Sequence, residues 1–183
     1  MKWLRYGALA LVGLIALAVL VLLALGQRKD AGRITNSIEI GRPAQDIWPW
    51  LTEPEKLKLW VGWLIEVRAL TPPPHGVGSK AMWVMEDRNN NNERVEVTDE
   101  VVEYDPPRRI KVRLTSAMGF DGEGVFKLTD LGNGRTQFEQ AGEYRFTSWL
   151  AKLFLPMIMH SARSKAAEDI QRLKSKVEES PAK

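Results

Sequence analysis

The sequence predicts an α+β fold in which a curved antiparallel sheet of about seven strands wraps around one long C-terminal helix. Between residues 33 and 146, short segments alternate polar and apolar residues, which is the period of strands. From Trp149 onward, apolar residues recur every three or four positions, as on one face of a helix. Two short helices are expected after the first strand, and one transmembrane helix before it.

The transmembrane helix is predicted from an uncharged run that covers residues 7–26. At 1.5 Å per residue such a run spans about 30 Å, the thickness of the hydrocarbon core of a bilayer. We expect residues 1–27 to be an uncleaved anchor and residues 28–183 to be the folded domain. The alternative is a cleaved signal peptide, whose apolar region is usually shorter, at about 7–15 residues.

The charges around this run give little information about its orientation. Lys2 and Arg5 precede it, and Arg28, Lys29 and Arg33 follow it. We expect a single-pass membrane protein, and a short N-terminal tail inside the cell would place the domain outside the cytoplasm.

The composition excludes several classes of function. The chain has 183 residues with 26 Lys+Arg and 23 Asp+Glu, but the first 26 residues hold two of the basic residues and no acid. The remainder therefore has 24 basic and 23 acidic residues, a near-neutral surface that does not indicate nucleic-acid binding. The absence of cysteine excludes disulfides and thiolate metal sites, and two histidines argue against a multi-histidine metal centre.

The first elements of the domain are read from turn and helix-start signals. Residues 33–41 predict a strand, and residues 44–51 a short helix. Thr52 and Glu55 have the spacing of a capping box, which predicts a second short helix that ends near Trp60. Six strand-like segments follow, at residues 64–70, 80–87, 94–104, 110–115, 124–130 and 136–144.

The C-terminal helix is predicted to be broadly apolar near its start and narrowly amphipathic near its end. A second apolar stripe that includes Phe154 and Met157 widens the apolar surface only in the first half. Pro156 should start or kink this helix. We expect the broad half to be buried on the sheet.

This order of elements is that of the helix-grip fold, and several motifs agree with it. They are Ser37-Ile38-Glu39-Ile40, Pro43-Ala44-Gln45-Asp46-Ile47-Trp48, Trp60-Val61-Gly62-Trp63, Gly76-Val77-Gly78-Ser79 and the segment from Val101 to Ile110. Over about residues 34–177 the chain resembles START-like (SRPBCC) proteins, in particular the polyketide cyclase/dehydrase and lipid-transport family. The resemblance implies a cavity between the sheet and the long helix that holds a hydrophobic small molecule or lipid, without a cofactor.

The candidate ligand-binding residues are large apolar side chains expected to face this cavity, together with one polar residue on the same side of a strand. Aromatic rings with a polar tip and adaptable methionines suit hydrophobic ligands, although both are also ordinary core residues. Gln140 shares its strand face with Phe138, so it needs a partner in the protein or the ligand. The candidates are Trp60, Trp63, Trp83, Met85, Phe126, Phe138, Gln140, Phe154 and Met157.

No catalytic residues are predicted. His75 and His160 have no evident triad partners, and no metal-ligand motif is present. Met118 and Phe120, at a predicted hairpin tip, are either folded onto the sheet, part of a flap at the cavity entrance, or in contact with the bilayer near the anchor.

Three functions are open at this point. The first is a membrane-anchored domain that binds or transports a lipid-like molecule. The second is a cyclase or dehydratase acting on a polyketide-like substrate. The third is a protein-interaction module without a ligand, and the sequence identifies no protein partner.

Overall fold

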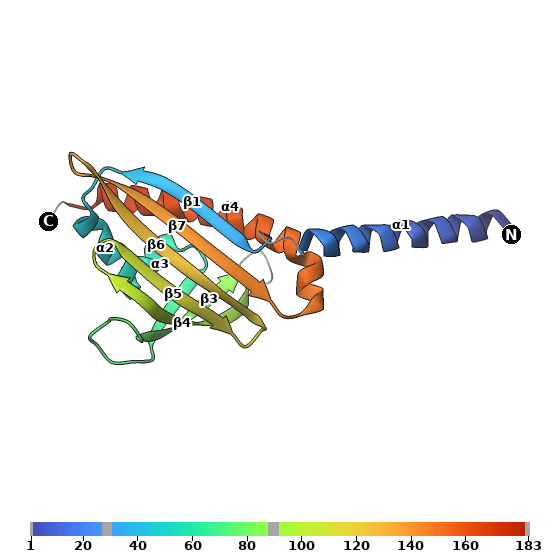
Figure 1. Ribbon diagram of the computed structural model, residues 1–183, viewed down its shortest axis with the longest axis horizontal. Coiled ribbons are helices and arrows are strands. Elements are labelled where there is room, and N and C mark those ends of the chain that lie inside the picture. The colour runs from blue at the N-terminus through green and yellow to red at the C-terminus, as the bar shows by residue number, and fades with distance from the viewer. Residues whose placement is uncertain (1, 27–30, 88–91, 182–183) are drawn as a thin grey trace.

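The computed structural model describes residues 2–26, 31–87 and 92–181, and the order of elements predicted from the sequence is confirmed in them (Figure 1). The elements are α1 (Lys2–Gly26), β1 (Arg33–Ile40), α2 (Ala44–Thr52), α3 (Pro54–Trp60), β2 (Leu64–Ala69), β3 (Lys80–Asp87), β4 (Glu93–Asp105), β5 (Arg109–Ser116), β6 (Phe120–Gly132), β7 (Arg135–Phe146) and α4 (Trp149–Glu179).

The strands form one antiparallel sheet in the order β1-β7-β6-β5-β4-β3-β2, with α4 lying across its concave side (Figure 1). Successive side chains of a strand point to opposite faces, so each strand gives one set of side chains to each face. The outer face carries cross-strand ion pairs such as Lys111–Glu123 at 2.8 Å and Lys127–Glu139 at 2.7 Å. Exposed ion pairs contribute about 0–1 kcal/mol each to stability, so these charges mainly make the outer face hydrophilic.

The capping box predicted for the second short helix is wrong. Thr52 is the last residue of α2, and its hydroxyl donates to the Trp48 carbonyl at 3.1 Å. Glu53 is the N-cap residue of α3 and makes no side-chain cap bond. The reason is Pro54, which disfavours a helical conformation at the residue before it and so places the break at Glu53.

One end of the space between sheet and helix is filled by a closed core. Phe138, Leu173, Ile40 and Ile47 are each fully buried in it, and Val177 extends it towards the end of α4. The remaining buried members are Trp50, Leu51, Leu57, Trp60, Leu64, Leu128 and Ile170.

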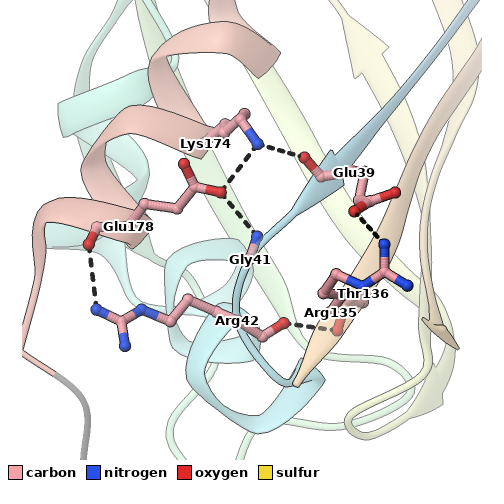
Figure 2. Close-up of polar contacts among 7 residues, drawn as sticks. All are labelled: Glu39, Gly41, Arg42, Arg135, Thr136, Lys174 and Glu178. Carbon is pink, nitrogen blue, oxygen red and sulfur yellow. Dashed lines mark hydrogen bonds and ion pairs between the residues drawn. The ribbon is translucent and has the colours of Figure 1, made fainter. Parts of the chain in front are cut away.

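Polar contacts fasten the end of α4 over this closed core (Figure 2). The Glu178 carboxylate accepts hydrogen bonds from the Gly41 N–H at 2.7 Å and from Lys174 Nζ at 2.9 Å. Lys174 also donates to the Glu39 carbonyl at 2.7 Å, and Arg42 donates to the Glu178 carbonyl at 3.1 Å. The Gly41 N–H and then Lys174 lower the pKa of Glu178. We call these five residues the C-terminal clasp.

The other end of α4 meets α1. Pro156 lies inside α4, and the first part of the helix is inclined to the rest (Figure 1), in agreement with the predicted kink. Pro156 has no N–H to donate to the Lys152 carbonyl, and Gly26 lies so close to that carbonyl oxygen that a Cβ at Gly26 would overlap it. The two helices therefore touch where the backbone of α4 is irregular.

α1 leaves the domain at this end, opposite the C-terminus (Figure 1). Among the described helices, it alone has the length and composition of a membrane span, with a mean hydropathy of 3.0 over Leu9–Gly26. None of that stretch is buried against the domain. A signal sequence would have the same properties.

Candidate functional site

A cavity of about 470 Å³ lies between the concave face of the sheet and the middle of α4. It forms because alternate residues of each strand point inward and most of them are apolar. The strand residues around it include Ala81, Trp83 and Met85 of β3, Val95 and Val97 of β4, Ile110, Val112 and Leu114 of β5, and Phe126 of β6.

Small residues leave the space open. Ala162 and Ala166 face it from α4, and Ala81 and Gly124 face it from the sheet. A Cβ at Gly124 would lie 3.3 Å from the Val112 side chain, which is tighter than ordinary van der Waals contact. Because these positions carry few side-chain atoms, the inner faces of sheet and helix do not meet here.

The structure places six of the nine predicted ligand-binding residues around this cavity and three outside it. Trp60, Trp63, Trp83, Met85, Phe126 and Gln140 line it. Phe138 is fully buried in the closed core, whereas Phe154 and Met157 are 45% and 66% exposed. Phe138 has the predicted facing but lies beyond the end of the cavity. Phe154 and Met157 lie on another face of α4 than Leu155 and Met159, which are buried, so the wide apolar surface predicted here is buried on one side only.

Trp60 separates the cavity from the closed core. Its indole N–H donates to the Trp50 carbonyl at 2.8 Å, and its ring makes edge contacts with Phe126 at 5.8 Å and with Phe138 at 6.4 Å between centroids. With its polar group paired inside the protein, Trp60 presents only apolar surface to the cavity.

Gln140 has a protein partner. Asn36 lies directly across from it on β1 and donates to its side-chain carbonyl at 3.4 Å. Gln140 is therefore at least partly satisfied without a ligand, as one of the two interpretations of the sequence allowed.

Asp99 is the most unusual residue around the cavity, and it was not among the candidates predicted from the sequence. It is 6% exposed, and burial raises its pKa to about 7. The pattern that could have identified it is visible in β4, where Val95, Val97, Asp99 and Val101 alternate on one face and all line the cavity. An acid within an alternating apolar series is a buried acid if that face is inward.

A second acid on the wall, Asp169, has the partners that Asp99 lacks. Asp169 Oδ1 accepts from the Gly62 N–H at 3.1 Å and from Arg172 at 3.2 Å. Burial raises its pKa, while the Gly62 N–H and the Arg172 charge oppose that change. Arg172 also donates to the Trp60 carbonyl at 2.9 Å, so Asp169 fastens α4 to the turn after α3.

At the hairpin tip between β5 and β6, one of the two large apolar side chains folds back onto the sheet and the other is exposed. Phe120 folds back and lines the cavity, with its ring stacked on Phe146 at 5.8 Å between centroids. Met118 is 60% exposed. The Gly119 carbonyl accepts hydrogen bonds from both the N–H and the hydroxyl of Thr147, so the tip is fastened to the loop before α4.

Both histidines lie at the surface of the domain. His75 is exposed at the rim of the cavity, and His160 is exposed on α4. Burial raises the pKa of the Tyr144 phenol, which lines the cavity. The described residues contain no group of three His, Asp or Glu side chains that could hold a metal ion.

Comparisons with known proteins agree with this architecture. A conserved protein from Geobacillus kaustophilus superposes with a TM-score of 0.65 at 16% identity, over 79% of this chain and 94% of its own. A protein from Thermus thermophilus superposes with a TM-score of 0.66 at 15% identity, over 79% of this chain and 96% of its own. DynU16, a protein in the dynemicin biosynthetic locus, gives 0.57 at 15% identity, over 81% of this chain and 48% of its own.

At these identities the solved structures establish the fold alone, and the comparison with curated proteins found no match. The family model described as polyketide cyclase / dehydrase and lipid transport matches residues 31–178, almost the whole domain after α1. The chain belongs to this polyketide cyclase/dehydrase and lipid-transport family.

Proposed function

We propose that the chain is a membrane-anchored domain that binds, and can carry, a hydrophobic or lipid-like small molecule. The observation that carries this proposal is the cavity of about 470 Å³ with its largely apolar lining. Cavities of about 300–1,000 Å³ with apolar linings and few polar groups are typical of small-molecule sites. The closed core stabilises the fold at one end, so the cavity does not have to be filled for the domain to fold.

The anchor is proposed from α1 and from the surface beside it. Apolar side chains at the start of α4 are exposed, among them Trp149 at 72%, Phe154 and Met157. The start of α4 lies at the end of the domain from which α1 leaves (Figure 1). A bilayer that holds α1 would be close to this surface, and it is also a reservoir of apolar ligands at high effective concentration.

We propose residues 1–27 as the anchor and residues 28–183 as the domain, on the side of the membrane away from the cytoplasm. Mass spectrometry of the protein isolated from membranes would test the anchor. An intact N-terminus is expected, and a mature chain that starts at Gln27 would show that the segment is a cleaved signal peptide.

The binding function can be tested with one matched pair of variants on α4. Ala162 faces the cavity and Ala167, five residues later, is exposed. Ala162→Trp should fill part of the cavity and lower the affinity for 1,6-diphenylhexatriene, a purely hydrocarbon fluorescent probe, at least tenfold. Ala167→Trp adds the same side chain to the surface and should leave the affinity unchanged.

The titration uses the full chain in lipid nanodiscs, with protein-free nanodiscs as the blank. Equal probe binding by the wild type and Ala162→Trp would contradict the proposal. If the wild type bound no hydrophobic probe at all, an interaction module without a ligand would be the better interpretation.

Asp99 favours a second candidate, a cyclase or dehydratase. A carboxyl with a pKa of about 7 is present in both protonation states near neutral pH, which suits proton transfer to or from a bound substrate. Turnover of a polyketide-like substrate that is abolished in Asp99→Asn, with diphenylhexatriene binding retained, would support this candidate over binding alone.

A further inference from the structure

We propose that Asp99 is the polar contact for the ligand of this cavity, and that the ligand carries a hydrogen-bond donor, an amine or a hydroxyl, on its apolar body. This inference rests on the proposed binding function and specifies the chemistry of the ligand. It is carried by the contrast between Asp99 and every other buried polar side chain that the structure describes.

Among the described residues, three polar or charged side chains are buried: Asp99, Thr136 and Asp169. Thr136 donates to the Arg42 carbonyl at 2.7 Å, and Asp169 accepts from Gly62 and Arg172. The carboxyl group of Asp99 has no hydrogen bond or ion pair to any described residue. Buried polar groups in proteins are almost always hydrogen-bonded, so an unpaired carboxyl calls for a partner that is not part of the fold.

The carboxyl group of Asp99 opens onto the cavity. Among the described residues, every side-chain oxygen or nitrogen that is fully buried has a hydrogen-bond partner. The oxygens of the Asp99 carboxyl have none, so they must keep some accessible surface. Asp99 lines the cavity, and a side chain only 6% exposed has no other place for that surface. Its cross-strand neighbours are Ala81 on β3 and Leu114 on β5, which offer no side-chain donor. The short side chain of Ala81 leaves room beside the carboxyl.

The other titratable groups on the wall of the cavity do not neutralise Asp99. Lys165 on α4 pairs with Glu168 at 3.4 Å, and Lys80 on β3 pairs with Glu100 at 3.7 Å. The remaining groups are His75, Tyr104, Tyr144 and Asp169. Burial alone accounts for the raised pKa of Asp99, and no charge from any element contributes to it.

The chemistry of the carboxyl group sets the ligand class. An ionised carboxylate only accepts hydrogen bonds, so it selects donors and repels a second carboxylate. In an apolar cavity the bond from a cationic amine is charge-assisted and therefore stronger than the bond from a neutral hydroxyl. Binding of an amine should tighten as pH rises through about 7, because the ionised form of Asp99 then predominates.

Three probes with the same alkyl chain and different head groups would test this inference: dodecylamine, 1-dodecanol and dodecanoic acid. Each displaces diphenylhexatriene from the full chain in nanodiscs at pH 6 and pH 8, with Ala162→Trp nanodiscs as the blank for partition into lipid. For the wild type at pH 8 we expect the amine to bind at least tenfold more tightly than the acid, with the alcohol between them.

Two substitutions on β4 separate the carboxyl of Asp99 from the net charge of the domain. Asp99→Asn should reduce the preference for amine over acid to less than threefold and remove its pH dependence. Glu96→Gln removes one charge from the outer face of the same strand, where Glu96 pairs with Arg68, and should leave the preference unchanged. Asp99→Leu should also lose the preference for the alcohol over the acid, because the leucine side chain has no polar atom.

The outcomes distinguish this inference from the proposed function. Wild-type protein that binds diphenylhexatriene but shows no preference for the amine, or Asp99→Asn that keeps the preference, would overturn the role of Asp99 alone. Wild-type protein that binds none of the probes would overturn the binding function, and the inference with it.

Discussion

The two halves of α4 cover the same sheet in opposite ways. Towards its C-terminus, Ile170, Leu173 and Val177 fill the space above the sheet, and the C-terminal clasp fastens the helix end. Towards its middle, Ala162 and Ala166 face a cavity. The same pair of elements thus provides stability at one end and an open site at the other, a division that lets the site stay open without unfolding the domain.

The largest expected effect concerns Asp99 in the hollow half. Its pKa of about 7 in the folded protein is above the ordinary 3.8, so its neutral form favours folding. The stabilisation that comes from the neutral form is fully present below about pH 4 and is lost as pH rises to about 7. The free energy of unfolding should fall over this range by on the order of 4 kcal/mol. Urea unfolding of the full chain in nanodiscs should show this decline for the wild type and not for Asp99→Asn. Parallel pH profiles for the two proteins would contradict it.

A matched pair of leucines compares the packing of the two halves. Leu173 is fully buried in the closed core, and Leu114 borders the cavity. Leu173→Ala should destabilise the domain by about 3 kcal/mol, because it creates a new void in packed surroundings. Leu114→Ala enlarges a space that already exists and should lower the free energy of unfolding by about 1 kcal/mol. Equal losses would show that the two halves are packed alike.

The clasp should have a smaller effect. Glu178→Gln weakens the bonds to Gly41 and Lys174, and a partly exposed charged hydrogen bond of this kind contributes about 1 kcal/mol. Glu179→Gln is the control, since the described polar contacts of the Glu179 side chain are to Ser175 and Lys176 on the same helix. In urea unfolding, Glu178→Gln should have a lower midpoint than Glu179→Gln. Identical midpoints would show that the clasp does not stabilise the domain.

The smallest change in stability is expected at the exposed start of α4. The double variant Trp149→Ser/Met157→Ser should alter the free energy of unfolding by less than about 0.5 kcal/mol, because the two residues are 72% and 66% exposed. It should nevertheless slow the transfer of diphenylhexatriene from donor vesicles if this surface contacts the bilayer. Stopped-flow fluorescence would measure that rate, and an unchanged rate would argue against a membrane contact here.

Most of the fold could be predicted from the sequence because it follows from local periods. Alternation identified each strand, and a helical period after Trp149 identified α4. Alternation also predicted that Phe126 faces inward, and Phe126 lines the cavity. It could not show how far along α4 the cavity extends, which is why Phe138 was expected at the site and lies in the closed core.

The remaining differences have specific physical causes. Phe154 and Met157 follow the helical period, but they lie on an exposed face of α4, whereas Leu155 and Met159 on another face are buried. Where a helix has two apolar stripes, the period alone does not show which stripe meets the sheet. Asp99 could have been found from the alternation of β4. Its lack of a partner depends on the side chains that β3, β5 and α4 place around it, and the local sequence pattern of β4 does not contain that information.

Native mass spectrometry of the full chain, isolated from membranes in nanodiscs, would show whether the cavity holds a ligand. We expect the wild type and Ala167→Trp to retain a bound small molecule, and Ala162→Trp to lose it. A wild-type protein that carries no bound molecule and takes up none from added dodecylamine or dodecanoic acid would contradict the claim that the hollow half of the domain is a binding site.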